Sequence, residues 1–142
     1  MNQKPVLAFA EVTAAMDAMI KAAASEPERP LSFAIVDENG ELLAYSRMDG
    51  ASAPKWGATI KKAYTAARFR EDTVKVAERM KANGRSLSEY NDPNLFAVQG
   101  GIVVTRPSDG AALGAIGVGG RRSDEDEVIA RIGLAAMKLG GE

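Results

Sequence analysis

Residues Ala112 to Glu127 read ALGAIGVGGRRSDEDE, and this stretch decides the fold that the sequence predicts. Its first half mixes glycines with small and branched apolar residues, which indicates a central strand that lets a helix or a ligand approach the backbone. Gly119 and Gly120 end that strand, and two arginines follow. Ser123 is then the expected N-cap of a helix, because the carboxylates behind it complement the positive end of the helix dipole. We therefore expect a site where this strand passes into this helix.

The composition narrows the classes of protein to which the chain can belong. A single domain of 142 residues buries roughly two-thirds of the surface that its unfolded form exposes. The net charge of -1 gives no general attraction to nucleic acid or to an anionic membrane. The absence of cysteine and histidine excludes disulfides, thiolate metal sites and imidazole bases. Glu11 and Asp17 interrupt the first apolar run, so we expect no secretory signal and a cytoplasmic location.

The order of the elements follows from apolar periodicity and from turn residues, among which Asn39-Gly40 is a strong hairpin signal. The sequence predicts helices at 5–25, 54–69, 73–82 and from 123 to the glycines at 140–141, and strands at 31–36, 41–47, 95–98, 101–106 and 112–119. In the second helix, Trp56, Ile60 and Tyr64 lie on the predicted apolar stripe, with Lys62 on a different face. Together these elements indicate an α/β (α+β) fold with a largely antiparallel sheet.

Four runs of residues carry a resemblance to a known family. They are VDENGELLAYSRMDGA at 36–51, KAYTAARF at 62–69, GG at 100–101 and DGAALGAIGVGGRRSDEDEVIARIGLAAM at 109–137. In this order they resemble the GlcG/HbpS family, which includes haem-binding and haem-degrading proteins and the C-terminal domain of certain corrinoid adenosyltransferases. The resemblance implies a profilin-like fold, in which helices flank both faces of a five-stranded antiparallel sheet of order 2-1-5-4-3. It also implies a homo-oligomer, either a dimer or a larger assembly.

The implied strand order brings two distant segments together, because the first strand lies between the second and the fifth. We therefore expect a pocket for a small organic anion near Asp49, in which guanidinium groups bind the ligand bidentately and glycines allow close approach. The expected ligand-binding residues are Arg47, Gly119, Gly120, Arg121 and Arg122. In the alternative interpretation these arginines pair with neighbouring carboxylates or are solvated, and the glycines serve only close packing.

Acid–base chemistry is a competing interpretation of the same segments. Asp49 with Lys62, or Tyr64, would act as the acid or base if burial shifts a pKa toward neutrality. The protein would then be a cofactor-free isomerase, lyase or hydrolase of a small organic acid. The structural alternative is an ion pair between Asp49 and Lys62 that joins the hairpin to the next helix. The sequence leaves both interpretations open.

Haem enters only through the resemblance. Without His or Cys, the axial ligands left for its iron are three tyrosines, a methionine or none. A magnesium site at Asp124, Asp126 and Glu127 is a further alternative. Carboxylates in a first helical turn more often cap the helix, so we predict no metal site.

Three further expectations concern partners. Nine of the 18 Lys and Arg residues lie between Lys55 and Arg85, but the aromatic residues among them fall on or near the apolar stripe. Nucleic-acid binding needs basic and stacking groups on one face, so we predict none, and no membrane binding. The small residues Ala63, Ala66 and Ala67 permit close helix packing between subunits, which favours a homo-oligomer.

Overall fold

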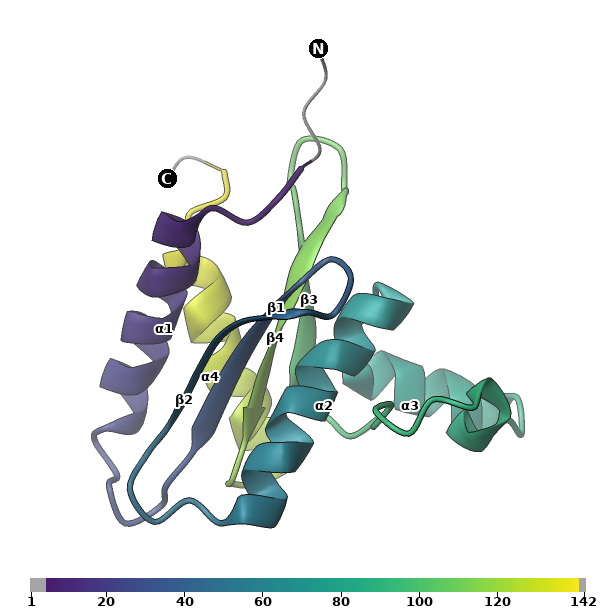
Figure 1. The fold of residues 1–142 in the computed structure, drawn as a ribbon, viewed down its shortest axis with the longest axis horizontal. Coiled ribbons are helices and arrows are strands. Elements are labelled where there is room, and N and C mark those ends of the chain that lie inside the picture. Colours follow the sequence, from purple (N-terminus) through teal and green to yellow (C-terminus); the bar gives the residue numbers. More distant parts are fainter. Residues whose placement is uncertain (1–4, 141–142) are drawn as a thin grey trace.

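Helices cover both faces of one antiparallel sheet in the computed structural model, which describes residues 5–140 (Figure 1). The strands are β1 (Ser32–Asp37), β2 (Leu42–Arg47), β3 (Gly101–Thr105) and β4 (Ala112–Gly119), in the order β2-β1-β4-β3. The helices are α1 (Phe9–Ala23), α2 (Ala53–Phe69), α3 (Thr73–Ala82) and α4 (Ser123–Ala136), with a 3-10 helix η1 (Leu87–Tyr90). The side chains of Ala53, Lys55 and Trp56 lie outside the description, and with them the predicted place of Trp56 on an apolar stripe.

The described residues form four strands, so the prediction of five strands in the order 2-1-5-4-3 is wrong in its number. The strand expected at 95–98 does not form, because hydroxyl groups of two helices bind its backbone instead. The Phe96 N–H donates to Oγ1 of Thr65 at 2.7 Å, and Oγ1 of Thr73 donates to the Val98 carbonyl at 2.7 Å. The other four strands keep the predicted neighbours. The likeness to profilin stays a prediction.

The hairpin between β1 and β2 forms at the predicted Asn39-Gly40 pair. Gly40 alone of the two has a positive φ, of +86°. The Gly40 N–H donates to the Asp37 carbonyl at 3.0 Å, and the Asp37 N–H donates to the Glu41 carbonyl at 2.8 Å. Glycine therefore supplies the left-handed residue that follows the turn in a three-residue hairpin loop.

Helices α1 and α4 begin in the same way, with the N–H of the N-cap residue donating to a Glu side chain three residues later. The N-cap residue of α4 differs from the predicted one. In α4 the N-cap residue is Arg122, and its N–H donates to the Glu125 carboxylate at 3.2 Å, so the prediction of Ser123 as the N-cap is wrong. In α1 the Ala8 N–H donates to the Glu11 carboxylate at 2.7 Å. These Glu side chains satisfy a donor at each helix start. Helix α4 ends at Ala136, earlier than the glycines that were expected to end it.

Helix α2 lies close to β4 because small residues separate them. A Cβ atom on Gly117 would lie 2.4 Å from the Thr59 carbonyl oxygen, so a side chain there would push α2 off the sheet. The buried side of α2 carries Thr59, Lys62, Ala63, Ala66 and Ala67, whereas Ile60 and Tyr64 are only half-buried. The buried face of α2 is therefore rotated by about one residue from the predicted apolar stripe.

The small residues of α2 pack inside the protein. Ala63, Ala66 and Ala67 form an apolar cluster with Ala34 and Ala115 of the sheet. The prediction that they serve contact between subunits is therefore not supported by their place in the fold. The opposite face of the sheet packs larger side chains against α1 and α4. No helix within residues 5–140 is both long enough and apolar enough to span a membrane.

Candidate functional site

The ends of β2 and β4 lie on either side of the start of β1. Ser32 pairs with Arg47 of β2 and with Gly119 of β4. Side chains of directly paired residues share one face of a sheet, and the Ser32 hydroxyl lies 2.7 Å from that of Thr59 in α2. Arg47 and Gly119 therefore lie in one row on the face that α2 covers.

The structure divides the expected site residues between separate cavities. A groove of about 360 Å³ lies between the C-terminal part of α1 and β2, on the face opposite α2, and residues 46–49 of the edge strand, Arg47 and Asp49 among them, border it. Residues 119–121 line another cavity of about 240 Å³, together with Lys62. Among the described residues, none lines both. We call the second one the Lys62 cavity; it is lined by Ala58, Lys62, Phe96, Val98, Ser123, Asp126 and residues 119–121.

A buried ion pair lies in the Lys62 cavity. Nζ of Lys62 donates to Oδ2 of Asp126 and to the Val118 carbonyl, both at 3.0 Å, and the two side chains are 5% and 2% exposed. Oδ1 of Asp126 accepts the Arg121 N–H at 3.0 Å. Burial raises the pKa of the Asp126 carboxyl, and the ammonium group of Lys62 opposes that rise. Because such a pair is expensive to desolvate, its presence in a cavity marks a candidate site.

The glycine pair at 100–101 makes room for this lysine. A Cβ atom on Gly100, whose φ is +126°, would lie 2.8 Å from Nζ of Lys62. A Cβ atom on Gly101 would lie 2.4 Å from the Lys62 carbonyl oxygen. In the sequence this glycine pair is notable only for the family resemblance, and the structure gives it this physical role.

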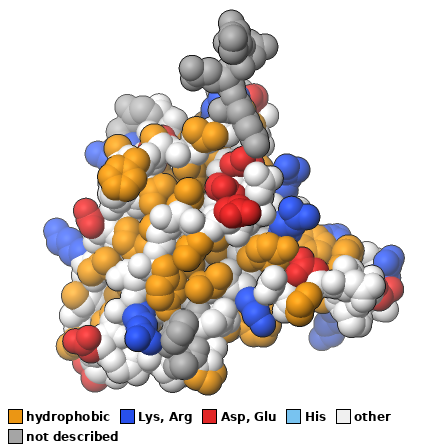
Figure 2. Space-filling model, viewed as in Figure 1, with side chains coloured by type: hydrophobic (Ala, Val, Ile, Leu, Met, Phe, Trp, Pro, Cys, Tyr) orange, Lys and Arg blue, Asp and Glu red, His pale blue; other side chains and the backbone are white. Residues whose placement is uncertain are grey.

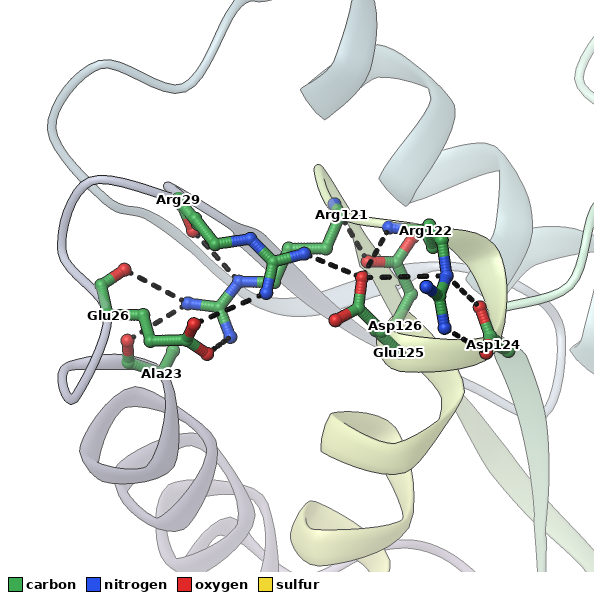
Figure 3. A network of polar contacts seen from close by, with 8 residues as sticks. All are labelled: Ala23, Glu26, Arg29, Arg121, Arg122, Asp124, Glu125 and Asp126. Carbon is green, nitrogen blue, oxygen red and sulfur yellow. Dashed lines mark hydrogen bonds and ion pairs between the residues drawn. The ribbon is translucent and has the colours of Figure 1, made fainter.

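The guanidinium group of Arg121 binds the protein's own backbone and points toward the end of α1, away from Asp126 (Figure 3). Its Nε donates to the Arg29 carbonyl at 2.9 Å, and its Nη2 donates to the carbonyls of Ala23 and Glu26 at 3.1 and 3.2 Å. The side chain is 5% exposed. It therefore caps the C-terminal end of α1, where a positive charge is favourable.

Arg122 lies on the surface, where its side chain is 74% exposed. Its Nη2 lies 2.8 Å from the Asp124 carboxylate, which lowers the pKa of that carboxyl to about 2 (Figure 3). Glu125 pairs with Arg29 at 2.6 Å and lies 3.9 Å from Nε of Arg122. The two arginines of the sequence motif thus have different environments, and neither directs its charge into the Lys62 cavity.

The expected acid–base residues are also separated. The carboxylate that Lys62 contacts is Asp126, in place of the expected Asp49. Tyr64 donates its hydroxyl to Asp92 at 2.5 Å and so joins α2 to the loop after η1. This hydrogen bond raises the pKa of Tyr64, which makes its hydroxyl a poorer proton donor near neutrality.

Sequence reasoning named Asp126 in the magnesium alternative and missed it as the partner of Lys62, because it belongs to an acidic first turn. Its spacing did hold a signal, since Asp126, Ile129, Ala130 and Gly133 share the buried face of α4. Within residues 5–140, no group of three or more Asp and Glu side chains is placed to hold a metal ion.

Comparison with known proteins places this fold in a family. Residues 7–135 match the family described as haem-degrading protein HbpS-like. The chain belongs to the HbpS-like family. An uncharacterized 15.0 kDa protein of the dhaT-dhaS intergenic region of Citrobacter freundii is 30% identical over 138 residues, covering 94% of this chain and 96% of that protein. Protein GlcG of Escherichia coli K12 is 40% identical over 88 residues, covering 62% of this chain and 63% of GlcG.

Solved structures have the same architecture. A double mutant of HbpS from Streptomyces reticuli superposes with a TM-score of 0.82 at 32% identity, covering 95% of this chain and 89% of that one. A complex of PduOC with haem gives a TM-score of 0.83 at 24% identity, covering 94% of this chain and 96% of that one. At this identity the second likeness shows the fold alone.

Among the side chains that could bind a haem iron in this HbpS-like chain, Tyr64, Tyr45 and Met48 are poorly suited to do so. The sequence has no His or Cys. The Tyr64 hydroxyl is bound to Asp92, and burial raises the pKa of Tyr45, which disfavours the tyrosinate that binds iron. The sulfur of Met48, which lines the groove between α1 and β2, accepts the Leu31 N–H at 3.2 Å.

Proposed function

We propose that this HbpS-like protein binds a small organic anion in the Lys62 cavity. The observation that carries the proposal is the buried ammonium group of Lys62 in a cavity of about 240 Å³. An ammonium group has three donors, and Val118 and Asp126 accept two of them, which leaves one for a ligand oxygen. The haem-binding relatives of the family support ligand binding in general.

The proposed site keeps part of the constellation that the sequence suggested. Residues 119–120 remain as backbone that a ligand approaches closely, and Lys62 becomes the principal cation. Arg121 stays at the wall of the cavity with its charge directed to α1, and Arg122 lies outside it. Arg47 and Asp49 belong to the other groove.

A titration with propionate, followed by amide NMR at constant ionic strength, tests this function. We expect saturable shifts at residues 119, 120 and 123 in the wild type, and none in Lys62→Met, which keeps the side chain's length and removes its charge. Lys61→Met is the matched control, because Lys61 is the exposed neighbour on the same helix. Equal shifts in wild type and Lys62→Met would contradict the proposal.

An enzyme is the second candidate function, and the raised pKa of Asp126 favours it. A carboxylate beside a buried ammonium group can take a proton from carbon next to a carbonyl, while Lys62 stabilises the developing oxyanion. Pyruvate in D₂O is a suitable probe. Deuterium incorporation at its methyl group that is lost in Asp126→Asn would establish this chemistry, and equal rates with both proteins would exclude it for this probe.

Haem is the other ligand that the family description suggests. Since Tyr45, Tyr64 and Met48 are poorly suited to bind its iron, a haem would be held mainly by its ring and its propionates. We expect a hemin titration to give no stoichiometric Soret shift. A sharp shift that saturates at one haem per chain would favour haem over the small anion.

We also propose that the chain forms a homo-oligomer. Leu42 and Leu43 on the edge strand β2 are 50% and 46% exposed, and Phe9 of α1 is 83% exposed. Hydrophobic side chains spread over this side of the molecule (Figure 2). Light scattering tests the proposal, because a particle of 15 kDa at physiological salt would contradict it.

A further inference from the structure

The Lys62 cavity has a polar part and an apolar part. Lys62 and Ser123 supply polar groups, whereas Phe96 and Val98 supply an apolar wall from the segment after η1. Phe96 is half-buried and Val98 is 37% exposed. Apolar side chains that line a cavity bind the apolar part of a ligand, while a few polar groups orient it.

The apolar wall is held in place from several sides. Thr65 and Thr73 bind the backbone of this segment at Phe96 and Val98, and Nε2 of Gln99 donates to Glu127 of α4 at 3.3 Å. A wall that is fixed by hydrogen bonds can distinguish ligands by their length, because it does not move freely to accept a longer one.

The cavity offers one cation, and that cation already has a carboxylate partner. The guanidinium group of Arg121 is bound to the last carbonyl of α1, to two carbonyls of the segment after it, and to the Glu26 carboxylate. Arg122 is exposed and paired with Asp124. A ligand with two negative charges would therefore meet the Asp126 carboxylate with no cation left to balance its second charge.

The volume of the Lys62 cavity limits the size of the ligand. Pockets for drug-sized ligands measure about 300–1,000 Å³, and the Lys62 cavity measures about 240 Å³. From charge, lining and size together we infer that the ligand is a short-chain monocarboxylate. Its carboxylate accepts the remaining N–H of Lys62, and its alkyl end lies against Phe96 and Val98. This inference rests on the function proposed above and names the ligand class of the same site.

Calorimetric titration with a series of acids at pH 7 and constant ionic strength tests it. The series is acetate, propionate, butyrate and hexanoate, with succinate as the dicarboxylate of similar length to butyrate. We expect about fourfold tighter binding for each added methylene up to butyrate, since each buried methylene contributes about that factor. Hexanoate is expected to bind no tighter than butyrate, and succinate at least tenfold more weakly.

Two variants of the wall test its role. Phe96→Ala should weaken butyrate about tenfold and acetate less than twofold. Val98→Thr keeps the side chain's shape and should weaken butyrate about threefold, which provides a readout if Phe96→Ala does not fold. Phe9→Ala is the matched control, because Phe9 is 83% exposed on α1 and lies outside the cavity.

The outcomes separate this inference from the proposed function. If none of the acids binds, the proposed function fails and this inference fails with it. If acids bind and Lys62→Met abolishes binding, but affinity does not depend on chain length or succinate binds as tightly as butyrate, the function stands and the ligand class is overturned. Chain-length dependence that both wall variants leave intact would also overturn it.

Discussion

Nζ of Lys62 lies 3.0 Å from Oδ2 of Asp126, and each side chain is at least 95% buried. The two residues belong to helices on opposite faces of the sheet, α2 and α4. Lys62 also donates to the carbonyl of Val118, near the end of β4. The ion pair therefore joins the two helical layers at the end of the central strand, where Gly119 and Gly120 leave the backbone open to a ligand.

Loss of one partner of this pair should destabilise the protein strongly. Lys62→Met leaves the Asp126 carboxylate buried without its cation, and we expect a loss of about 3 kcal/mol in the free energy of unfolding. This is the low end for a broken buried pair, because the neighbouring cavity admits water. Urea denaturation measures the change.

The double variant Lys62→Met/Asp126→Asn separates the pair from its surroundings. Asparagine can still accept the Arg121 N–H through its carbonyl oxygen, and no charge stays buried. We expect the double variant to lose less stability than Lys62→Met alone, and Lys61→Met to stay within about 0.5 kcal/mol of the wild type. A double variant that is less stable than both single variants would contradict this account.

Arg121 and Arg122 provide a second comparison, because they are adjacent in sequence and differ in burial. Arg121→Met removes hydrogen bonds to three backbone carbonyls, one at the end of α1 and two in the segment after it, and we expect it to cost about 3 kcal/mol. Arg122→Met removes an exposed pair with Asp124 and should change stability by less than about 0.5 kcal/mol. Thermal unfolding of both variants checks the order, and equal losses would show that the contacts of Arg121 contribute little.

The sequence was sufficient to predict the elements that depend on periodicity and turn chemistry. The hairpin at Asn39-Gly40, the helix at 73–82 and the long glycine-containing strand all form where local residues favour them. The predicted strand at 95–98 failed because its apolar residues are also suited to a cavity wall. Hydroxyl groups of Thr65 and Thr73, distant in sequence, bind its backbone, and no local pattern reports such long-range contacts.

The sequence predicted which segments line the candidate site better than it predicted which side chains point into it. Residues 119–120 and Lys62 do line one cavity, but the arginines were expected to aim their charges into it. Arg121 and Arg122 look equivalent in sequence, and only the position of the α1 end decides that Arg121 caps that helix. Asp126 was missed because acidic residues at a helix start have a simpler explanation in the helix dipole. Its place on the buried face of α4 was the available signal.

The pH dependence of the free energy of unfolding should reveal the protonation of the Asp126 carboxyl. Burial raises the pKa of this carboxyl above its ordinary value of 3.8, so the folded state holds the proton more tightly than the unfolded state. Its contribution is therefore fully present below pH 3.8 and is lost as the pH rises through the folded pKa. We expect the stability difference between wild type and Asp126→Asn to fall over this window, measured by urea denaturation from pH 3 to 7. A difference that rises with pH would mean that the attraction of Lys62 outweighs burial.

The hydrogen bond between Tyr64 and Asp92 holds the loop after η1 against α2, and it should affect the pKa of Asp92. The tyrosine hydroxyl lowers the pKa of Asp92, and the Asn94 N–H contributes in the same direction. Tyr64→Phe removes the larger of these effects, so we expect the pKa of Asp92 to rise toward 3.8, followed by carboxyl carbon NMR. Stability from a lowered carboxyl pKa is lost as the pH falls, so the variant should lose less stability than the wild type on acidification. Tyr90→Phe is the control, because Asp92 accepts its tyrosine hydrogen bond from Tyr64. An unchanged pKa of Asp92 in Tyr64→Phe would show that this hydrogen bond does not form in solution.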